Sequence, residues 1–254
     1  MSSRMIFVCA LTALLLPAMT MAQEDEAESP PFAYGTYFEC DANREWLADA
    51  IVEQLYKPIY DEAVSDGTLS AWGYLAHHTG GKWRRVLYQV APTIEGVMAA
   101  VGTLGEKAEA ANAQAVAEFG SICSSHDDYL WQSVVGSSGT DVGENRGAVG
   151  FSTYLHCNEA TETDADEVVK TVFAPIYDAQ VAAGNLVSWG YMQHWVGGEY
   201  RRLLTMTAVD LPMLIKGRDS AVNAMVEMEE AAGDFFAACT SHSDYIWDIK
   251  QETP

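Results

Sequence analysis

The sequence predicts an α+β protein made of two tandem copies of one unit, in which a strand, a helix, a hairpin, a helix and a strand follow one another. Two observations carry this prediction. The chain matches itself after a shift of 117 residues, and after a shift of 116 residues towards the end of each copy. Within each copy, apolar residues change from period-two to helical spacing in the same order. Self-similarity of this length indicates a duplicated fold unit.

The repeat is carried by ordered matches of aromatic, glycine, arginine and cysteine residues. In sequence order it pairs Cys40 with Cys157, 58–61 with 175–178, 72–74 with 189–191, His77 with His194, 80–81 with 197–198, 84–85 with 201–202, Cys123 with Cys239, and Trp131 with Trp247. Each copy should therefore fold in the same way, with repeat 1 at 32–134 and repeat 2 at 150–254. The Gly- and Ser-rich stretch 135–149 between them is expected to be a linker.

The elements of each copy follow from periodicity and from glycine and proline positions. In the first copy we expect strands at 34–40, 70–78, 82–90 and 127–133 and helices at 43–66 and 93–119; in the second, strands at 151–157 and 244–249, a hairpin at 187–207 and helices at 164–183 and 211–237. Pro58 should kink the first helix, and Gly102 and Gly105 should break the second. Gly80 and Gly81 should form the hairpin turn, because glycine tolerates positive φ.

The first 22 residues have the charged, apolar and small-residue order of a secretory signal peptide, with cleavage expected after Ala22. A membrane anchor is the alternative, but the apolar run is shorter than the roughly 20 residues that a spanning helix needs. Residues 23–31 are acidic and end in a proline pair, which predicts a flexible leader. The mature protein is therefore expected to be periplasmic or secreted, without a membrane segment.

The chain has 254 residues and a formal net charge of −22, from 14 basic and 36 acidic residues. Nucleic acids and anionic membrane surfaces would both repel such a protein, so neither is an expected partner. The charge favours solubility, with an acidic binding surface as the alternative reading.

The predicted element order is the split βαβ, or ferredoxin-like, order, whose antiparallel sheet carries helices on one face only. The other face needs a cover, and the fused second copy supplies one. With its Trp-Gly-Tyr hairpin, Gly-Gly turn and Arg-Arg return strand, the chain resembles the dimeric α/β-barrel superfamily, in which two such units enclose a chamber. The resemblance implies an intramolecular pseudo-dimeric barrel, with pairing across chains left open. That superfamily includes cofactor-free monooxygenases, haem-handling enzymes and isomerases, and the fold does not choose among them.

Four cysteines remain after export, two in each copy. In the ferredoxin-like topology the first and last strands are antiparallel neighbours, which predicts disulfides between Cys40 and Cys123 and between Cys157 and Cys239 in an oxidising compartment. Free structural thiols are the alternative. No two cysteines have the CxxC spacing of a metal site.

An even-numbered hairpin loop places His77 opposite Arg84 and Leu75 opposite Val86, so residues of like parity share a face. We assign the aromatic and polar face to the chamber and the aliphatic face, with His77 and Arg84, to the helices. An odd loop would exchange the two faces. The candidate ligand-binding residues are Trp72, Tyr74, Arg85, Trp189, Tyr191 and Arg202, with His77 and His194 near the hairpin ends. Arg85 and Arg202 suit a carboxylate or phosphate, although pairing with a local Asp or Glu is an equal alternative.

The sequence contains no Ser-His-Asp order with elbow glycines, no phosphate loop and no HExxH motif. It therefore predicts no cofactor and no metal, and His77 and His194 are better explained as hydrogen-bonded histidines than as ligands. The leading function is a small-ligand pocket for an anionic or aromatic molecule, with cofactor-independent oxygenase or isomerase chemistry. The alternative is a non-catalytic interaction or structural module whose chamber is filled core.

Overall fold

The computed structural model describes residues 30–138 and 147–253. The expected signal peptide, most of the acidic leader and the middle of the expected linker lie outside the described residues. Within the described ranges, no helix is both long enough and apolar enough to cross a membrane.

The first half of the chain contains four strands and three helices. They are β1 (Phe32–Glu39), α1 (Glu45–Ile51), α2 (Lys57–Ser65), β2 (Ala71–Thr79), β3 (Arg85–Ala91), α3 (Ile94–Ile122) and β4 (Ser125–Ser138). The kink expected at Pro58 takes the form of a π-helical turn, Val52–Tyr56, that joins α1 to α2. The break in α3 falls at Asn112 instead of Gly102 or Gly105. The Asn112 side chain explains this, because it accepts a hydrogen bond from the Ala115 backbone N–H at 3.1 Å and so caps the second segment.

The second half repeats this order with a divided last helix. Its elements are β5 (Val149–Cys157), α4 (Glu162–Val168), a π turn (Val169–Phe173), α5 (Ala174–Ala182), β6 (Ser188–Val196), β7 (Arg202–Ala208), α6 (Leu211–Glu227), α7 (Gly233–Ala238) and β8 (Cys239–Glu252). Asp210 caps α6 by accepting the Met213 backbone N–H at 2.8 Å.

The eight strands form one closed antiparallel barrel in the order β1-β3-β2-β8-β5-β7-β6-β4, with β4 pairing back onto β1. The two halves join along two seams, β2 with β8 and β4 with β6. Both seam strands β4 and β8 extend beyond the expected 127–133 and 244–249, because each pairs with a strand of its own half and one of the other half. Residues 136–138, expected in the linker, are therefore strand.

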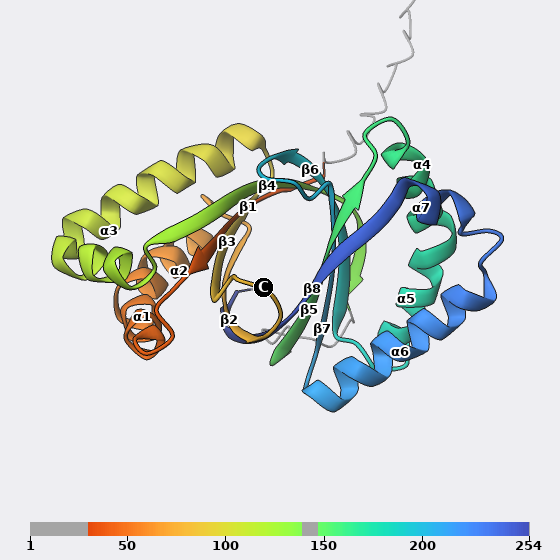
Figure 1. The fold of residues 1–254 in the computed structure, drawn as a ribbon. Helices are drawn as coiled ribbons and strands as arrows, with labels where there is room; N and C mark the ends of the chain where they lie inside the picture. The colour runs from red at the N-terminus through yellow and green to blue at the C-terminus, as the bar shows by residue number, and fades with distance from the viewer. Residues whose placement is uncertain (1–29, 139–146, 254) are drawn as a thin grey trace, which may run out of the picture.

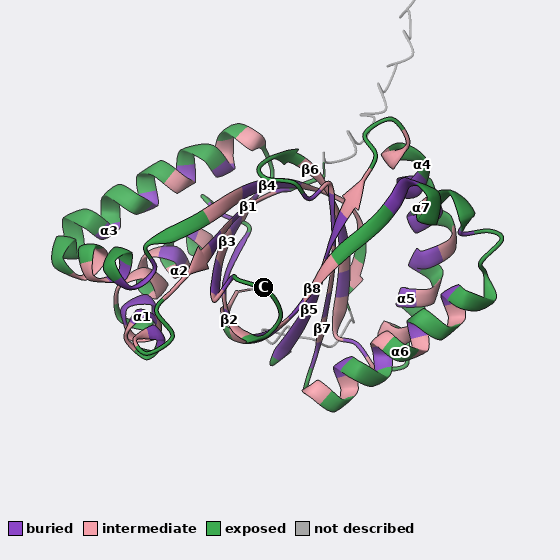
Figure 2. Cartoon of the chain, in the orientation of Figure 1, coloured by how far each residue is buried: buried purple, intermediate pink, exposed green. Residues whose placement is uncertain are grey.

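The helices lie outside the barrel, with α1, α2 and α3 against one side and α4 to α7 against the opposite side (Figure 1). Burial follows this layering: the central parts of the strands and the inner faces of the helices are buried or half-buried, and the outer helix faces are exposed (Figure 2). The buried apolar residues form three clusters, one between each helix layer and the sheet and a third, mainly aromatic one inside the barrel.

Both predicted disulfides are present in the structure. Cys40 is bonded to Cys123 and Cys157 to Cys239, each within one half of the chain. Each bridge ties the end of the first strand of a half to the start of its last strand. In the chain-entropy model, a bridge across more than 80 residues stabilises the fold by roughly 4 kcal/mol.

The glycine pairs at the hairpin tips do more than turn the chain, because each lies against a tyrosine of the other half. A Cβ on Gly197 would lie 2.5 Å from the Tyr129 ring and 2.7 Å from the Asp128 carbonyl oxygen. A Cβ on Gly80 would lie 2.5 Å from the Tyr245 ring. Both glycines have φ of 142°. The tips therefore require glycine for its conformation and for the close approach.

We predict that Gly197→Ala lowers the free energy of unfolding by at least about 1–3 kcal/mol, through backbone strain and the clash with Tyr129. Gly102→Ala is the matched control, since no atom lies within 4 Å of its Cβ position. In the exposed interior of α3 it should stabilise the protein by up to about 1 kcal/mol. Urea unfolding measures both changes, and equal effects of the two variants would contradict the interlock.

Candidate functional site

The hairpin register is as predicted, but the assignment of its faces is wrong. Ala76 pairs with Arg85 and Leu75 with Val86, as an even loop requires. Leu75 and Val86 point into the barrel, where they line a cavity. Arg85 lies on the outer face beneath α1, so the aromatic and polar face of the hairpin packs against the helices.

Carboxylates on the helices explain this inversion. Arg85 donates from Nε and Nη2 to the two oxygens of Asp49, at 2.7 and 2.9 Å, and is 4% exposed. The Tyr74 hydroxyl donates to the same carboxylate at 3.0 Å. The Trp72 indole N–H donates to Asp61 Oδ1 at 2.9 Å. A bidentate pair with a buried arginine must face its acid, so the hairpin turns this face outward.

The second half has the same arrangement. Arg202 donates to both oxygens of Asp166, at 2.6 and 2.8 Å, and is 2% exposed. The Trp189 indole N–H donates to Asp178 Oδ1 at 2.7 Å. Tyr191 is buried and lines a cavity between the sheet and the helices. The two predicted arginine anchors are therefore structural ion pairs, which is the alternative that the acidic composition left open.

His77 and His194 belong to these ion-pair networks. Arg84 Nη1 lies 2.7 Å from His77 Nδ1 and Arg201 Nη1 lies 3.1 Å from His194 Nδ1. A guanidinium only donates, so both Nδ1 atoms accept and the rings are neutral. Burial, helped by the adjacent arginine charges, lowers the pKa of both histidines. Among the residues with described positions, no group of three or more His, Cys, Asp or Glu side chains is arranged to hold a metal.

The barrel interior is filled at the hairpin-tip end by an aromatic plug. We use this name for the eight rings of Tyr37, Trp83, Tyr129, Trp131, Tyr154, Tyr200, Tyr245 and Trp247. The rings of Tyr129 and Trp131 stack at 5.0 Å, as do those of Tyr245 and Trp247. Rings from the first and last strands of each half thus fill this end of the interior, whereas the predicted hairpin residues Trp72, Tyr74, Trp189 and Tyr191 lie on the helix side.

Beyond the plug the barrel is hollow, with a chamber of about 390 Å³ lined by residues from all eight strands. Four plug residues, Tyr37, Trp131, Tyr154 and Trp247, form its floor. Its walls carry small and hydroxyl side chains, namely Ala33, Gly35, Ser133, Gly150, Ser152, Ser188, Gly190, Thr205 and Thr207. Glu252 is the one charged residue among the described side chains that line the chamber, and it accepts a hydrogen bond from the Tyr88 hydroxyl.

The polar atoms of the floor are uncharged donors and acceptors. Trp131 Nε1–H donates to the Tyr37 hydroxyl at 3.2 Å. Burial raises the pKa of Tyr37 and of Tyr154, so both phenols are neutral. Trp247 Nε1 is buried and has no acceptor among the described residues.

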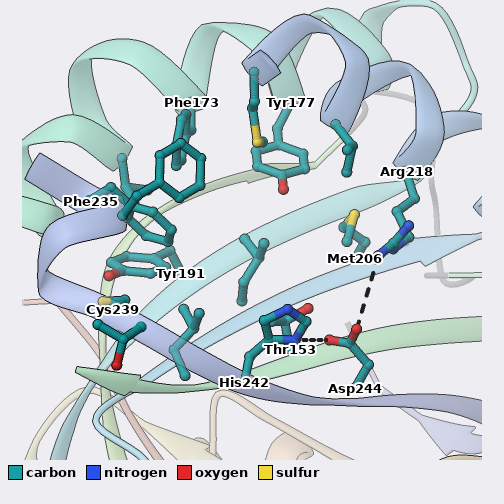
Figure 3. Close-up of a pocket in the computed structure, with 17 residues that line it drawn as sticks. Thr153, Phe173, Tyr177, Tyr191, Met206, Arg218, Phe235, Cys239, His242 and Asp244 are labelled. Carbon is teal, nitrogen blue, oxygen red and sulfur yellow. Dashed lines mark hydrogen bonds and ion pairs between the residues drawn. The ribbon is translucent and has the colours of Figure 1, made fainter. Parts of the chain in front are cut away.

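A second cavity, of about 490 Å³, lies between the sheet and the helices of the second half (Figure 3). We call it the interlayer pocket. Its walls are mainly apolar and include Leu155, Val169, Phe173, Leu204, Met206, Val222, Met225, Phe235 and Phe236. Arg218, His242 and Asp244 form its polar end (Figure 3). Such a volume, apolar lining and polar end are typical of small-molecule sites.

The polar end of the interlayer pocket holds a histidine oriented by a carboxylate. His242 Nδ1 lies 3.1 Å from Asp244 Oδ1 on strand β8. A carboxylate only accepts, so Nδ1 carries the hydrogen of this bond, which leaves Nε2 as the ring nitrogen that can exchange a proton with a ligand. Arg218 of α6 lies 4.0 Å from Asp244 and over the Phe151 ring. This arrangement supplies a proton acceptor beside an apolar cavity.

The two halves differ at the positions that create this pocket. In the first half, the Phe38 ring packs on Phe119 at 5.2 Å, and Phe119 packs on Tyr56 at 5.6 Å. The corresponding residue to Phe38 is Leu155, so the ring that fills this place in the first half is missing from the second. Phe235 is left with Phe173 at 4.9 Å and a cavity beside it.

No family model matches this sequence, and no curated protein matches it. Solved structures match over most of the chain. A “putative monooxygenase” from Lactobacillus acidophilus has a TM-score of 0.62 and 11% identity, covering 88% of this chain and 96% of the other. An anthrone oxidase-like protein has a TM-score of 0.55 and 10% identity, and the match covers 89% of this chain and 93% of the other. A mutant chlorite dismutase from Candidatus Nitrospira defluvii has a TM-score of 0.52 and 8% identity, and the match covers 87% of this chain and 92% of the other.

These matched proteins are members of the dimeric α/β-barrel superfamily. The chain has the dimeric α/β-barrel fold. Sequence identities of 8–11% support the fold alone, so these matches assign neither a substrate nor a reaction to this barrel.

The sequence analysis did not single out His242 and Asp244 as a pair. Their spacing of two on a strand puts both on one face, and this signal was available. It also missed the interlayer pocket, whose walls come from α5, α6 and α7 and depend on how these helices meet the sheet.

We predict that Arg202→Ala lowers the free energy of unfolding by about 3–5 kcal/mol, because it leaves the Asp166 carboxylate buried without its partner. Arg201→Ala is the control from the same strand end. Its side chain is 22% exposed and its partner Glu162 keeps Arg202 nearby, so its loss should cost less, about 1–2 kcal/mol. Chemical denaturation of the two variants measures the difference. A larger loss for Arg201→Ala would restore the original assignment of the faces.

Proposed function

We propose that this protein is an exported barrel of two tandem ferredoxin-like units that binds a small, mainly apolar ring compound in the interlayer pocket. The paired strand orders β4-β1-β3-β2 and β8-β5-β7-β6 support the tandem units. The two disulfides fit an oxidising compartment, which supports export. The observation that carries the ligand proposal is the cavity itself, present where Leu155 stands in place of a phenylalanine.

The chemistry that this site suits is proton abstraction from a carbon acid held in the pocket. His242 Nε2 takes the proton, and Asp244 holds the ring and stabilises the imidazolium that results. The carbanion is then reprotonated at another carbon, which is an isomerisation, or it reacts with O₂ as the added oxidant. Tyr191 and the phenylalanines orient the ring of the ligand. The alternative is a non-catalytic role, in which the protein binds the ligand in this pocket and does not convert it.

Anthrone is a suitable probe, since it is a flat carbon acid of three fused rings and one barrel neighbour is described as anthrone oxidase-like. Its oxidation consumes one O₂ and yields anthraquinone and water. We predict O₂ uptake with the full mature chain, and a fall of about 10²-fold or more in His242→Ala, because a general base contributes roughly that factor.

His126→Ala is the matched control, because His126 is the corresponding residue of the first half and pairs with Asp128 through Nε2, at 3.2 Å. It should leave the rate unchanged. Leu155→Phe should abolish both binding and turnover by restoring the ring that fills the first half. Equal losses in the two histidine variants, or an unaffected Leu155→Phe variant, would refute the site. Binding without O₂ uptake would assign the non-catalytic role.

A further inference from the structure

We propose that the barrel chamber is a second ligand site, separate from the interlayer pocket, and that it takes an uncharged ring compound carrying hydroxyl or carbonyl groups. The chamber and the interlayer pocket lie on opposite faces of the second-half sheet. Tyr154 lines the chamber and the next residue, Leu155, lines the pocket. Alternation along a strand therefore separates the two sites by the thickness of the sheet.

The shape of the chamber depends on one exchange between the halves. In the first half, the Tyr88 ring lies across Gly73, where a Cβ would come within 2.4 Å of it. The corresponding pair in the second half is Thr205 and Gly190, whose closest approach is 3.3 Å. A threonine occupies far less of the interior than a tyrosine. The space that the second ring would have filled is part of the chamber, and glycines at 35, 150 and 190 keep the walls back.

The lining of the chamber selects by charge. None of the described residues that line it is Lys, Arg or His. A bound anion would lose its hydration without gaining a counter-charge, and it would meet the carboxylate of Glu252. The hydrogen-bonding groups are instead neutral: the phenols of Tyr37 and Tyr154, Ser152, which is 5% exposed, and the serine and threonine hydroxyls of the walls.

The floor of the chamber suits a flat ring. Four aromatic side chains form it, and their edges and faces contact an aromatic or alicyclic ligand over a wide area. The buried Trp247 Nε1–H has no acceptor among the described residues, and a ligand oxygen bound at the floor would provide one. The volume of about 390 Å³ is in the range of small-molecule pockets.

The test uses three probes with one ring system: 2-naphthol, 2-naphthoate and 2-naphthylmethylammonium, which are neutral, anionic and cationic at pH 7. Trp131 and Trp247 line the floor of the chamber, so binding of a probe there should change the tryptophan fluorescence of the full mature chain. We expect 2-naphthol to bind at least about tenfold more tightly than either charged probe. Tightest binding of either charged probe would overturn the proposed ligand class.

Two filling variants locate the site. Thr205→Tyr copies Tyr88 and fills the chamber, and it should weaken 2-naphthol binding by at least about tenfold. Leu155→Phe fills only the interlayer pocket and should leave this binding within about twofold. Loss of 2-naphthol binding in Leu155→Phe alone would place the ligand in the interlayer pocket and overturn the second site. We also expect Thr205→Tyr to oxidise anthrone at the wild-type rate, because Thr205 does not line the interlayer pocket. The chamber site and the proposed function are therefore tested separately.

Should Thr205→Tyr fail to fold, Ser152→Val removes a buried hydroxyl with little change in volume. The expected result is then weaker binding of 2-naphthol with no change in binding of 2-methylnaphthalene, which lacks the hydroxyl. Equal affinity of wild type and Ser152→Val for 2-naphthol, or absence of 2-naphthol binding to the wild type, would refute the site.

Discussion

Besides the two strand seams, a reciprocal contact joins the two halves of this barrel: a tyrosine of each half lies under the glycine hairpin tip of the other. Tyr129 packs against Gly197 and Gly198, and Tyr245 packs against Gly80 and Gly81. The phenol oxygen of Tyr245 also receives hydrogen bonds from the backbone of Trp83 and Lys82. The tyrosines are at the same time members of the aromatic plug. The same two tyrosines therefore join the halves and fill one end of the barrel.

The plug explains why the interior is hollow at one end only. Eight large rings occupy the hairpin-tip end, whereas the other end is lined by glycine, serine and threonine. Both cavities arise where the second half carries a smaller residue than the first, Thr205 for Tyr88 and Leu155 for Phe38. Two equal copies would have filled both spaces. The two halves therefore differ at residues that border the two cavities.

Much of this architecture could be predicted from the sequence because it depends on local signals. The element order, the disulfide pairs and the hairpin register follow from periodicity, cysteine positions and the Gly-Gly turn. The faces of the hairpin could not be predicted from alternation, which divides residues into two sets without saying which set is inside. The deciding partners, Asp49 and Asp166, lie 36 residues before their arginines. One signal was present: the acids at 45 and 49 recur at 162 and 166, one helical turn apart.

The two halves share one interior core, so we expect them to unfold together. Hydrogen exchange followed by mass spectrometry across a urea titration of the full chain tests this most directly, because peptides from β3 (Arg85–Ala91) and β7 (Arg202–Ala208) report the halves separately. The reciprocal tyrosine contact predicts a single urea midpoint for both strands, shifted equally in both by Gly197→Ala. Two separate midpoints, or a Gly197→Ala shift confined to the second half, would contradict it.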